Sequence, residues 1–362
     1  MEYLFDDVLE IKNGKNQKAV ENPDGQYPIY GSGGIMGYAD DYICDADTVI
    51  IGRKGSINNP IYVAEPFWNV DTAFGLSAKK EHLLPRYLFY FCKKFDFEKL
   101  NKTVTIPSLT KSDLLKIKID LPSKEEQQYV VNKLTKIEKV IDFRRQELSA
   151  LDNLIKARFV ELFGDAIHND KGWETDTVEK LCKEIYGGGT PSKSHPEYYE
   201  DGDIPWVSSK DMKTDVLTDS HIKINQLGVD NSTARMVPIN SVIMVIRSGI
   251  LKHTLPVAIN AVPITVNQDL KVFIPNERVL TRFLAIQFKM HEKDILSGVR
   301  AVTADNIEFN SLKQRELIVP PIELQQEYVT FLEQIDKSKF AVQKALEQEQ
   351  LLFDSLMQKY FG

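Results

Sequence analysis

The stretch LPSKEEQQYVVNKLTKIEKVIDFRRQELSALDNLIKARFVELFG, residues 121–164, recurs at the end of the chain as PPIELQQEYVTFLEQIDKSKFAVQKALEQEQLLFDSLMQKYFG, residues 320–362. The two copies match first at four positions and then, after a one-residue slip, through the rest of their length. The first matches pair Pro122, Gln127, Tyr129 and Val130 with Pro321, Gln326, Tyr328 and Val329. The later matches pair Leu134, Ile137, Lys139, Leu148, Leu154, Phe163 and Gly164 with Leu332, Ile335, Lys337, Leu346, Leu352, Phe361 and Gly362. A repeat of this length indicates two whole modules rather than a solenoid unit.

Each copy is predicted to form one long amphipathic helix, because its apolar residues recur every three or four positions in a coiled-coil seam. Ser123 and Glu126 have the spacing of a capping box directly after Pro122, and Gly164 and Gly362 stand where a helix C-cap glycine belongs. The seam residues are Leu134, Ile137, Ile141, Leu148, Leu151, Ile155, Leu332, Ile335, Val342, Leu346, Phe353 and Leu356. At the rise of an α-helix, each copy gives a rod of about 60 Å.

The order of the segments constrains how the two helices pack. The first helix leads from one globular part to the next, and the second helix leaves the second globular part. If their seams pack together, the helices form an antiparallel pair with one domain at each end, in a pseudo-two-fold arrangement. Two unrelated core helices, each buried in its own domain, are the alternative. Polar gaps at different places in the two seams, Arg144 in one and Lys339 in the other, favour a shared interface.

Two globular domains of class α+β are predicted, because short strands and helices occur in mixed order between the repeats. The expected segments are a first domain at 1–121, a helix at 122–165, a second domain at 166–319 and a helix at 320–362. The domains echo each other: TVIIGRKG (48–55) parallels VIMVIRSG (242–249), a β-branched strand that leads to Arg53 in one domain and to Arg247 in the other.

Composition narrows the class of protein. The 362 residues, 43 % of them hydrophobic, are enough for two or more domains with cores of ordinary size. The net charge of −7 argues against a strongly basic coat for nucleic acid. The three cysteines are far apart and the six histidines are not clustered, so we expect reduced thiols in the cytoplasm and no metal site. The most apolar stretch, around 237–246, is too short to cross a membrane.

Four features together resemble the specificity subunit of type I restriction–modification systems, over essentially the whole chain. They are GGGTPSKSHPEYYEDGDIPWVSSKD (187–211), TVIIGRKGS (48–56), PFWNVDTAF (66–74) and the two repeated helices. The resemblance implies two target-recognition domains, each reading one half of a split, asymmetric sequence in double-stranded DNA. It implies that the paired helices space the half-sites and dock two methyltransferase subunits, which restriction/translocase subunits then join. S-adenosylmethionine, ATP and Mg are accordingly expected on the partner subunits and not on this chain.

Candidate DNA contacts lie in loops between the predicted core elements. Arg53 and Lys54 follow one buried strand, and Arg247 and Lys252 follow the other, in glycine-bearing loops where a cationic side chain contacts guanine or phosphate. The other candidates carry hydroxyl, amide or cationic groups: Lys102, Thr103, Ser108, Lys111, Thr190, Ser192, Lys193, Ser209, Lys210, Arg300 and Asn306. A turn with solvated charges is the alternative at these loops. Trp206 is expected in the core.

Motifs of an enzyme acting alone are only partly matched. Asn58-Asn59-Pro60-Ile61-Tyr62 partly matches the motif of adenine methyltransferases, but no cofactor glycine motif precedes it. Gly31-Ser32-Gly33-Gly34 lacks the Lys-Ser/Thr of a phosphate-binding loop, so we expect a structural turn there. We therefore predict a non-catalytic subunit of a type I deoxyribonuclease and N6-adenine methyltransferase complex. A coiled-coil adaptor that binds only protein is the alternative.

Overall fold

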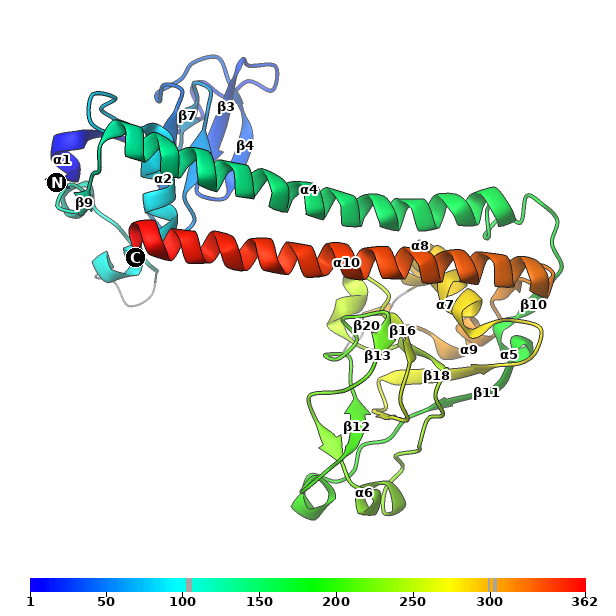
Figure 1. Cartoon of the computed structure of the whole chain (residues 1–362). Coiled ribbons are helices and arrows are strands. Elements are labelled where there is room, and N and C mark those ends of the chain that lie inside the picture. Colours follow the sequence, from blue (N-terminus) through cyan, green and yellow to red (C-terminus); the bar gives the residue numbers. More distant parts are fainter. Residues whose placement is uncertain (102–105, 299, 302–304) are drawn as a thin grey trace. The chain divides into compact units, whose positions relative to one another are not determined.

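The computed structural model describes residues 1–101, 106–298, 300–301 and 305–362, with the backbone alone at 300, 301 and 305 (Figure 1). These residues form two compact units. Unit 1 combines Met1–Glu147 with Val342–Gly362, and unit 2 is Leu148–Ala341. Each unit therefore contains one globular domain together with a part of both long helices.

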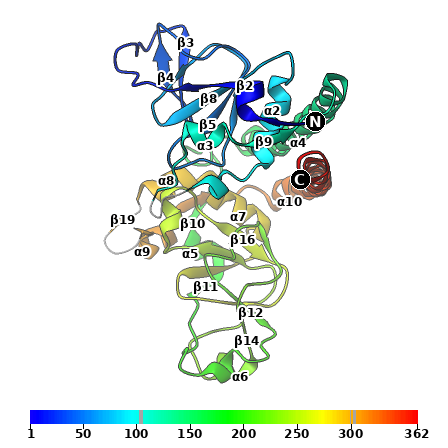
Figure 2. The same ribbon diagram turned by 90° about the vertical axis from the view of Figure 1, so that its left-hand side faces the viewer.

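Unit 1 contains a four-stranded sheet of order β2-β8-β5-β6, a three-stranded sheet of order β4-β3-β7, and a strand pair β1-β9 (Figure 2). The strands are β1 (Glu2–Leu4), β2 (Leu9–Asn13), β3 (Tyr27–Gly31), β4 (Gly34–Ala39), β5 (Thr48–Gly52), β6 (Ile61–Val63), β7 (Trp68–Asn69), β8 (Ala73–Ala78) and β9 (Lys118–Asp120). The side chains of β5 alternate between two cores, as strand geometry requires. Val49 and Ile51 join the cluster that contains helix α2 (Pro85–Lys94), whereas Ile50 packs with Phe67 on the opposite face.

Unit 2 repeats this plan. Its larger sheet has the order β11-β18-β15-β16-β13, its smaller sheet the order β14-β12-β17, and its strand pair is β10-β21. The strands are β10 (Thr175–Thr177), β11 (Cys182–Gly187), β12 (Ile204–Val207), β13 (Val216–Leu217), β14 (Lys223–Ile224), β15 (Val242–Val245), β16 (Val257–Asn260), β17 (Thr265–Val266), β18 (Leu270–Pro275) and β21 (Glu316–Ile318). Helix α7 (Thr281–Met290) takes the place of α2, and β13 is an addition at the sheet edge. The echo between the two domains is therefore a repeat of the fold.

The remaining elements are short. They are α1 (Phe5–Val8), η1 (Phe97–Leu100), α3 (Lys111–Leu114), α5 (Val178–Leu181), η2 (Pro196–Tyr198), α6 (Gln226–Asp230), η3 (Gly249–Lys252), α8 (Glu292–Ser297), β19 (Arg300–Ala301), β20 (Asp305–Asn306) and α9 (Phe309–Lys313). Helix α3 in unit 1 and helix α9 in unit 2 each lead into the last strand of their domain. Thr110 caps α3 by accepting from the Asp113 N–H, and Glu308 caps α9 by accepting from two N–H groups.

The two long helices are α4 (Lys124–Phe163) and α10 (Ile322–Phe361). The predicted capping box is present, because the Glu126 N–H donates to Ser123 Oγ at 3.2 Å and the Ser123 N–H donates to Glu126 Oε2 at 2.9 Å. The difference in residue number between the starts of α4 and α10 equals the difference between their ends, and it is the one that the later sequence matches have. The one-residue slip predicted between the repeats is therefore wrong. Tyr129 is 56 % exposed whereas Tyr328 is fully buried, and the two therefore occupy different positions on their helices.

Within each unit the helices run antiparallel, as expected. In unit 2, Arg158 pairs with Glu327 at 2.7 Å and Lys339 pairs with Asp152 at 2.7 Å, so residue numbers rise along one helix while they fall along the other. In unit 1, Arg144 lies 3.5 Å from Glu349. The polar gaps in the seams are thus filled by ion pairs to the other helix. The buried seam residues are Leu134, Ile141, Leu332, Ile335, Val342 and Phe353, and the half-buried ones are Ile137, Leu148, Leu151, Ile155, Leu346 and Leu356.

A buried glutamine joins each long helix to its domain. In unit 1, Gln127 Oε1 accepts from the Leu84 N–H at 2.9 Å, and its Nε2 donates to the carbonyls of His82 and Pro122. In unit 2, Gln325 makes the same three bonds, with the Leu280 N–H and with the carbonyls of Arg278 and Pro320. The difference in residue number between Gln127 and Gln325 equals that between the corresponding ends of α4 and α10. The structural counterpart of Gln127 is therefore Gln325, and not Gln326 as the sequence match suggested.

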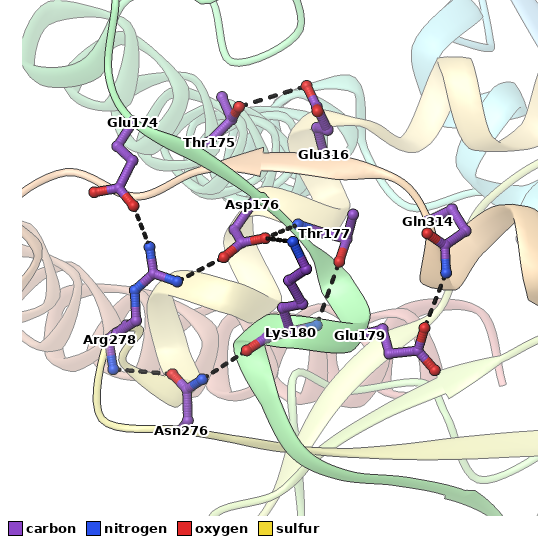
Figure 3. A network of polar contacts seen from close by, with 10 residues as sticks. All are labelled: Glu174, Thr175, Asp176, Thr177, Glu179, Lys180, Asn276, Arg278, Gln314 and Glu316. Carbon is purple, nitrogen blue, oxygen red and sulfur yellow. Dashed lines mark hydrogen bonds and ion pairs between the residues drawn. The ribbon is translucent and has the colours of Figure 1, made fainter.

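The unit 2 junction is reinforced by a polar network around Arg278 (Figure 3). Its guanidinium donates to Asp176 at 2.6 Å and to Glu174 at 2.5 Å, and its carbonyl is the one that accepts from Gln325. The hydrogen bond from Arg278 holds the pKa of Asp176 below its ordinary value. The network thus ties β10, where the domain begins, to the loop before α7 and to the start of α10.

Candidate nucleic-acid interface

In unit 1, two predicted contact loops meet beyond the buried strand β5. Lys54 forms an antiparallel backbone bridge with Ser108, and the Leu109 N–H donates to the Arg53 carbonyl at 3.0 Å. The Gly55 N–H donates to the Pro107 carbonyl at 3.1 Å, and Gly55 has a φ of +78°, a conformation that favours glycine. These bonds bring the first cationic loop and the segment before α3 into one surface.

Unit 2 brings its corresponding loops together in the same way. Arg247 forms an antiparallel bridge with Asn306, and the Ile307 N–H donates to the Ile246 carbonyl at 2.9 Å. By this pairing, the counterpart of Arg247 is Lys54. The prediction that Arg247 corresponds to Arg53 is therefore wrong by one residue, because the Arg53 carbonyl accepts from the Leu109 N–H where the Ile246 carbonyl accepts from the Ile307 N–H.

The Arg247 side chain is held by a carboxylate. Asp269 Oδ1 accepts from Arg247 Nε at 2.7 Å and from Nη2 at 2.6 Å, and a guanidinium has further N–H donors beyond these two. Burial, together with the positive charge of Arg247, lowers the pKa of the neighbouring Lys271. Lys271 lies 4.6 Å from the centre of the Phe309 ring. Asp269 and Lys271 belong to this site, and sequence reasoning missed them because they come from a different strand region.

Arg53 and Lys111 occupy different settings in unit 1. Arg53 is exposed, and its guanidinium lies 5.9 Å from the centre of the Phe74 ring, which helps to orient it. Lys111 is also exposed, and its ammonium donates to the Ile11 carbonyl at 2.6 Å. The Lys111 ammonium is thus turned toward strand β2 in this conformation.

The hydroxyl-rich candidates of unit 2 lie in two loops. Thr190 Oγ1 donates to Gln268, and Ser192 Oγ lies 2.7 Å from Ser194 Oγ, while Lys193 is exposed between them. The second loop carries half-buried Ser209 and exposed Lys210.

Asp211 fixes this second loop by accepting from the N–H and Oγ of Ser208, both at 2.8 Å, and from His221. Although burial raises it, the hydrogen bonds from His221 and Ser208 leave the pKa of Asp211 below its ordinary value. Trp206 is in the core, as expected, and its Nε1 donates to the Gly189 carbonyl at 2.9 Å.

The remaining candidates belong to unit 2 and to the segment after η1. Lys252 ends η3 and is exposed, and Asn306 is exposed in β20 opposite Arg247. Arg300 lies in β19, where the backbone pairs with Asn306, and its side chain is outside the described part of the chain. Lys102 and Thr103 also lie outside the described residues. The bridges therefore bring together Lys54 with Ser108 and Arg247 with Asn306, and among the described residues they link none of Thr190, Ser192, Ser209 or Lys210 to either pair.

Metal-binding and membrane-spanning features are absent from the described residues. No group of three or more His, Cys, Asp or Glu side chains within them is arranged to hold a metal ion. In the same part of the chain, no helix is long and apolar enough to cross a membrane.

Residues 2–153 and 170–351 match the family described as the type I restriction modification DNA specificity domain. The chain belongs to this family. Two matched segments, each covering one globular domain and part of a long helix, agree with the repeat of sheet order described above.

Two curated members of the family illustrate the similarity. The chain is 32 % identical to the specificity subunit of the Escherichia coli type I restriction enzyme EcoR124I/EcoR124II, over 65 % of this chain and 59 % of that protein. It is 23 % identical to the MjaIX specificity subunit of Methanocaldococcus jannaschii, over 85 % of this chain and 74 % of that protein. The match thus spans about three fifths of the length of the E. coli relative.

Solved structures show the same fold. The S subunit of the type I restriction–modification system from M. genitalium aligns with a TM-score of 0.66 at 16 % identity, covering all of this chain and 96 % of that one. A chain from a structure of type I R-M complex assembly and conformational transition aligns with a TM-score of 0.58, also at 16 % identity. At this level of identity, the similarity concerns the fold.

Proposed function

We propose that this chain is the DNA sequence-recognition subunit of a type I restriction–modification complex, and that each unit reads one half of a bipartite target. The observation that carries the proposal is the repeated pairing of a cationic residue with a polar one beyond a buried strand: Lys54 with Ser108, and Arg247 with Asn306. Family membership supports it independently.

The chemistry of these pairs suits base and phosphate contacts. Arginine forks onto guanine or phosphate, asparagine pairs bidentately with adenine, and serine accepts or donates at either type of base. The two units carry different residues at corresponding places, since serine and lysine in unit 1 stand where unit 2 has asparagine and arginine. Different side chains read different bases, so the target is asymmetric as well as split.

Docking of protein partners is supported by apolar side chains exposed on the long helices. Phe143 is 68 % exposed in unit 1, and Phe340 is 73 % exposed in unit 2. Leu154 and Leu352 are both exposed and occupy equivalent positions on α4 and α10. A repeated apolar position on each unit suits two copies of one partner. We assign this surface to two adenine methyltransferase subunits in the cytoplasm. Restriction/translocase subunits join through them, and S-adenosylmethionine, ATP and Mg bind on those partners.

The test is methylation by the reconstituted complex of this chain and its methyltransferase subunits. Mapping methylated adenines in the host genome gives both half-sites and the gap between them. In competition binding, the complex should prefer that duplex over random DNA, and the Lys54→Ala and Arg247→Ala variants should each cost about 1–3 kcal/mol if the side chain reads a base. If the side chain contacts a phosphate instead, the plot of log K against log salt concentration should become shallower by roughly 0.9 in the variant.

Lys116→Ala is the matched control, because Lys116 is an exposed lysine of unit 1 that follows α3 and takes no part in the paired loops. Equal affinity of the complex for target and random duplexes would favour the protein-only adaptor. Methyl transfer by the isolated chain with S-adenosylmethionine would show an enzyme in its own right. Either result would remove the proposed function.

A further inference from the structure

An exposed apolar pair sits near the tip of the hairpin formed by β3 and β4 in unit 1. Ile35 is 55 % exposed and Met36 is 63 % exposed. Residues 27–39 contain no charged side chain. Figure 2 shows this hairpin at the upper left edge of unit 1, beyond β8 and β5. Two large neighbouring apolar side chains facing water are a cost to the isolated protein, and such groups mark interaction sites.

The pairing of the hairpin sets where the two side chains lie, and the Met36 sulfur lies over Gly31, where an added Cβ would be 2.7 Å from it. Tyr30 pairs with Ile35 and Ile29 pairs with Gly37, so Met36 is the extra residue of a β-bulge. A bulge bends the strand and redirects side chains, and bulges are enriched next to functional sites. Ile29 and Ala39, farther from the turn, are buried with Trp68 and Val70. The buried core therefore ends before the bulge, and Ile35 and Met36 remain exposed there, with the Met36 side chain covering Gly31.

The tip is narrow because glycines surround the apolar pair. Gly34 has a φ of +118°, and a Cβ added at Gly33 or Gly34 would meet no atom within 4 Å. No side chain therefore widens the turn at these two positions. The result is a thin, uncharged projection that ends in two apolar side chains.

The same tip lies beside the cationic loop of the candidate interface. Ser32 Cβ would be 3.1 Å from a Cβ placed on Gly52, the residue directly before Arg53. One carboxylate lies along the hairpin, since Glu21 Oε1 would be 3.7 Å from a Cβ placed on Gly37, and Asp40, farther from the turn, accepts from Asn22 Nδ2 at 2.9 Å. The apolar pair is thus adjacent to cationic side chains that can bind phosphates. Proteins that kink DNA combine such cationic contacts with an apolar wedge that enters the base stack.

Unit 2 is built differently at the corresponding place. The strands that match β3 and β4 are β12 and β14, and residues 208–222 separate them where unit 1 has a two-residue turn. That segment carries Ser208 and Lys210; its Met212 and Leu217 are buried, whereas Val216 and Ile222 are each 43 % exposed. The exposed apolar residues of this segment are not neighbours in sequence, so the two-residue turn followed by an adjacent apolar pair is a feature of unit 1.

We propose that Ile35 and Met36 form a wedge that inserts at one base step of the half-site read by unit 1, unstacking that step and kinking the duplex. The proposal rests on the proposed function and adds a way of reading sequence that needs no hydrogen bond to a base. Pyrimidine–purine steps unstack most easily, so the wedge selects a flexible step. Its small size and its place beside Arg53 and Lys54 favour DNA over a protein surface as its partner.

The experiment uses the complex of the full chain with its methyltransferase subunits, without S-adenosylmethionine. Duplexes carry 2-aminopurine at successive positions of both half-sites, excluding the adenines that are methylated. We expect a several-fold rise in fluorescence at one step in the unit 1 half-site and none in the unit 2 half-site. The double variant Ile35→Ser/Met36→Ser should abolish this rise, and Ile35→Leu/Met36→Leu should keep it.

Ile239→Ser is the matched control, because Ile239 is 58 % exposed and precedes β15, at the end of that strand opposite to Arg247. This control should leave the fluorescence unchanged. Specific binding by the wild type with no unstacked step overturns the wedge and leaves the proposed function standing. Loss of methyltransferase binding in the double variant, with the fluorescent step retained, shows a protein interface instead. Equal binding of target and random duplexes overturns the proposed function itself.

Discussion

Replacing Gln127 with alanine should destabilise unit 1, because this one buried side chain satisfies three main-chain groups. It accepts from the Leu84 N–H at 2.9 Å and donates to the His82 carbonyl at 2.9 Å and to the Pro122 carbonyl at 3.1 Å. A buried N–H left without an acceptor costs about 1–3 kcal/mol, and each lost hydrogen bond about 0.5–1.5 kcal/mol. Allowing for relaxation of the two carbonyls, we expect a loss of about 2–4 kcal/mol in the free energy of unfolding.

Urea denaturation of the full chain measures this loss, and hydrogen exchange localises it. The Leu84 amide, deprived of its acceptor, should exchange faster in Gln127→Ala than in the wild type. Gln128→Ala is the matched control, since the Gln128 side chain is exposed and hydrogen-bonds to Asn132 on its own helix at 2.8 Å. The control should stay within about 0.5 kcal/mol of the wild type.

The same substitution can be made in unit 2. Gln325→Ala removes the equivalent bonds to Leu280, Arg278 and Pro320, and Gln326→Ala is its control. If Gln127→Ala and Gln128→Ala lose equal stability, or if the Leu84 amide exchanges at its original rate in Gln127→Ala, the glutamine does not hold the helix to the domain and the reasoning fails.

Three further outcomes are expected. Burial, helped by the charge of Arg315, lowers the pKa of His291 from 6.5 to about 4. As the pH falls, His291 therefore becomes protonated in the unfolded chain before it does so in the folded one. The free energy of unfolding should drop by about 3 kcal/mol between pH 6.5 and pH 4. His291→Leu should flatten that part of a stability–pH curve, and an unchanged slope would contradict this. Tyr328→Val should lower the free energy of unfolding in urea by about 2–4 kcal/mol, because the ring packs on Phe159 and Phe163 and the hydroxyl donates to the Ile155 carbonyl. The control Tyr129→Val, at an exposed position, should lower it by less than about 0.5 kcal/mol. Four residues inserted near Ala150, inside the continuous helix α4, should change the unread gap and keep both half-sites; methylation at the original spacing would refute the spacer hypothesis.

The long helices were predictable because their signal is local. Seam residues recur every three or four positions, and helix geometry alone places them on one face. Ser123 and Glu126 likewise form their capping box from neighbouring residues. The register of the repeat was not predictable, because Gln127 and Gln128 are alike in sequence and differ only in which one meets the Leu84 N–H of a distant loop.

For the candidate interface, too, part was predictable from local sequence and part was not. Residue type and the end of a β-branched strand were enough to single out Lys54 and Arg247 as cations in glycine-bearing loops. Their partners Ser108 and Asn306 were also singled out, but as members of separate loops. Only backbone bridges between segments far apart in the chain made each a pair, and they also showed that Lys54 and not Arg53 corresponds to Arg247.

The sequence by itself determined that the protein contains two modules, where its long helices lie and which loops carry polar and cationic groups, because these follow from repetition and from short-range periodicity. The tertiary structure decided the register of the repeat, the backbone pairing of loops within each unit and the exposure of Met36 at its bulge. Those features depend on hydrogen bonds between strands, and such bonds are fixed by which distant segments meet and not by the residues on either side.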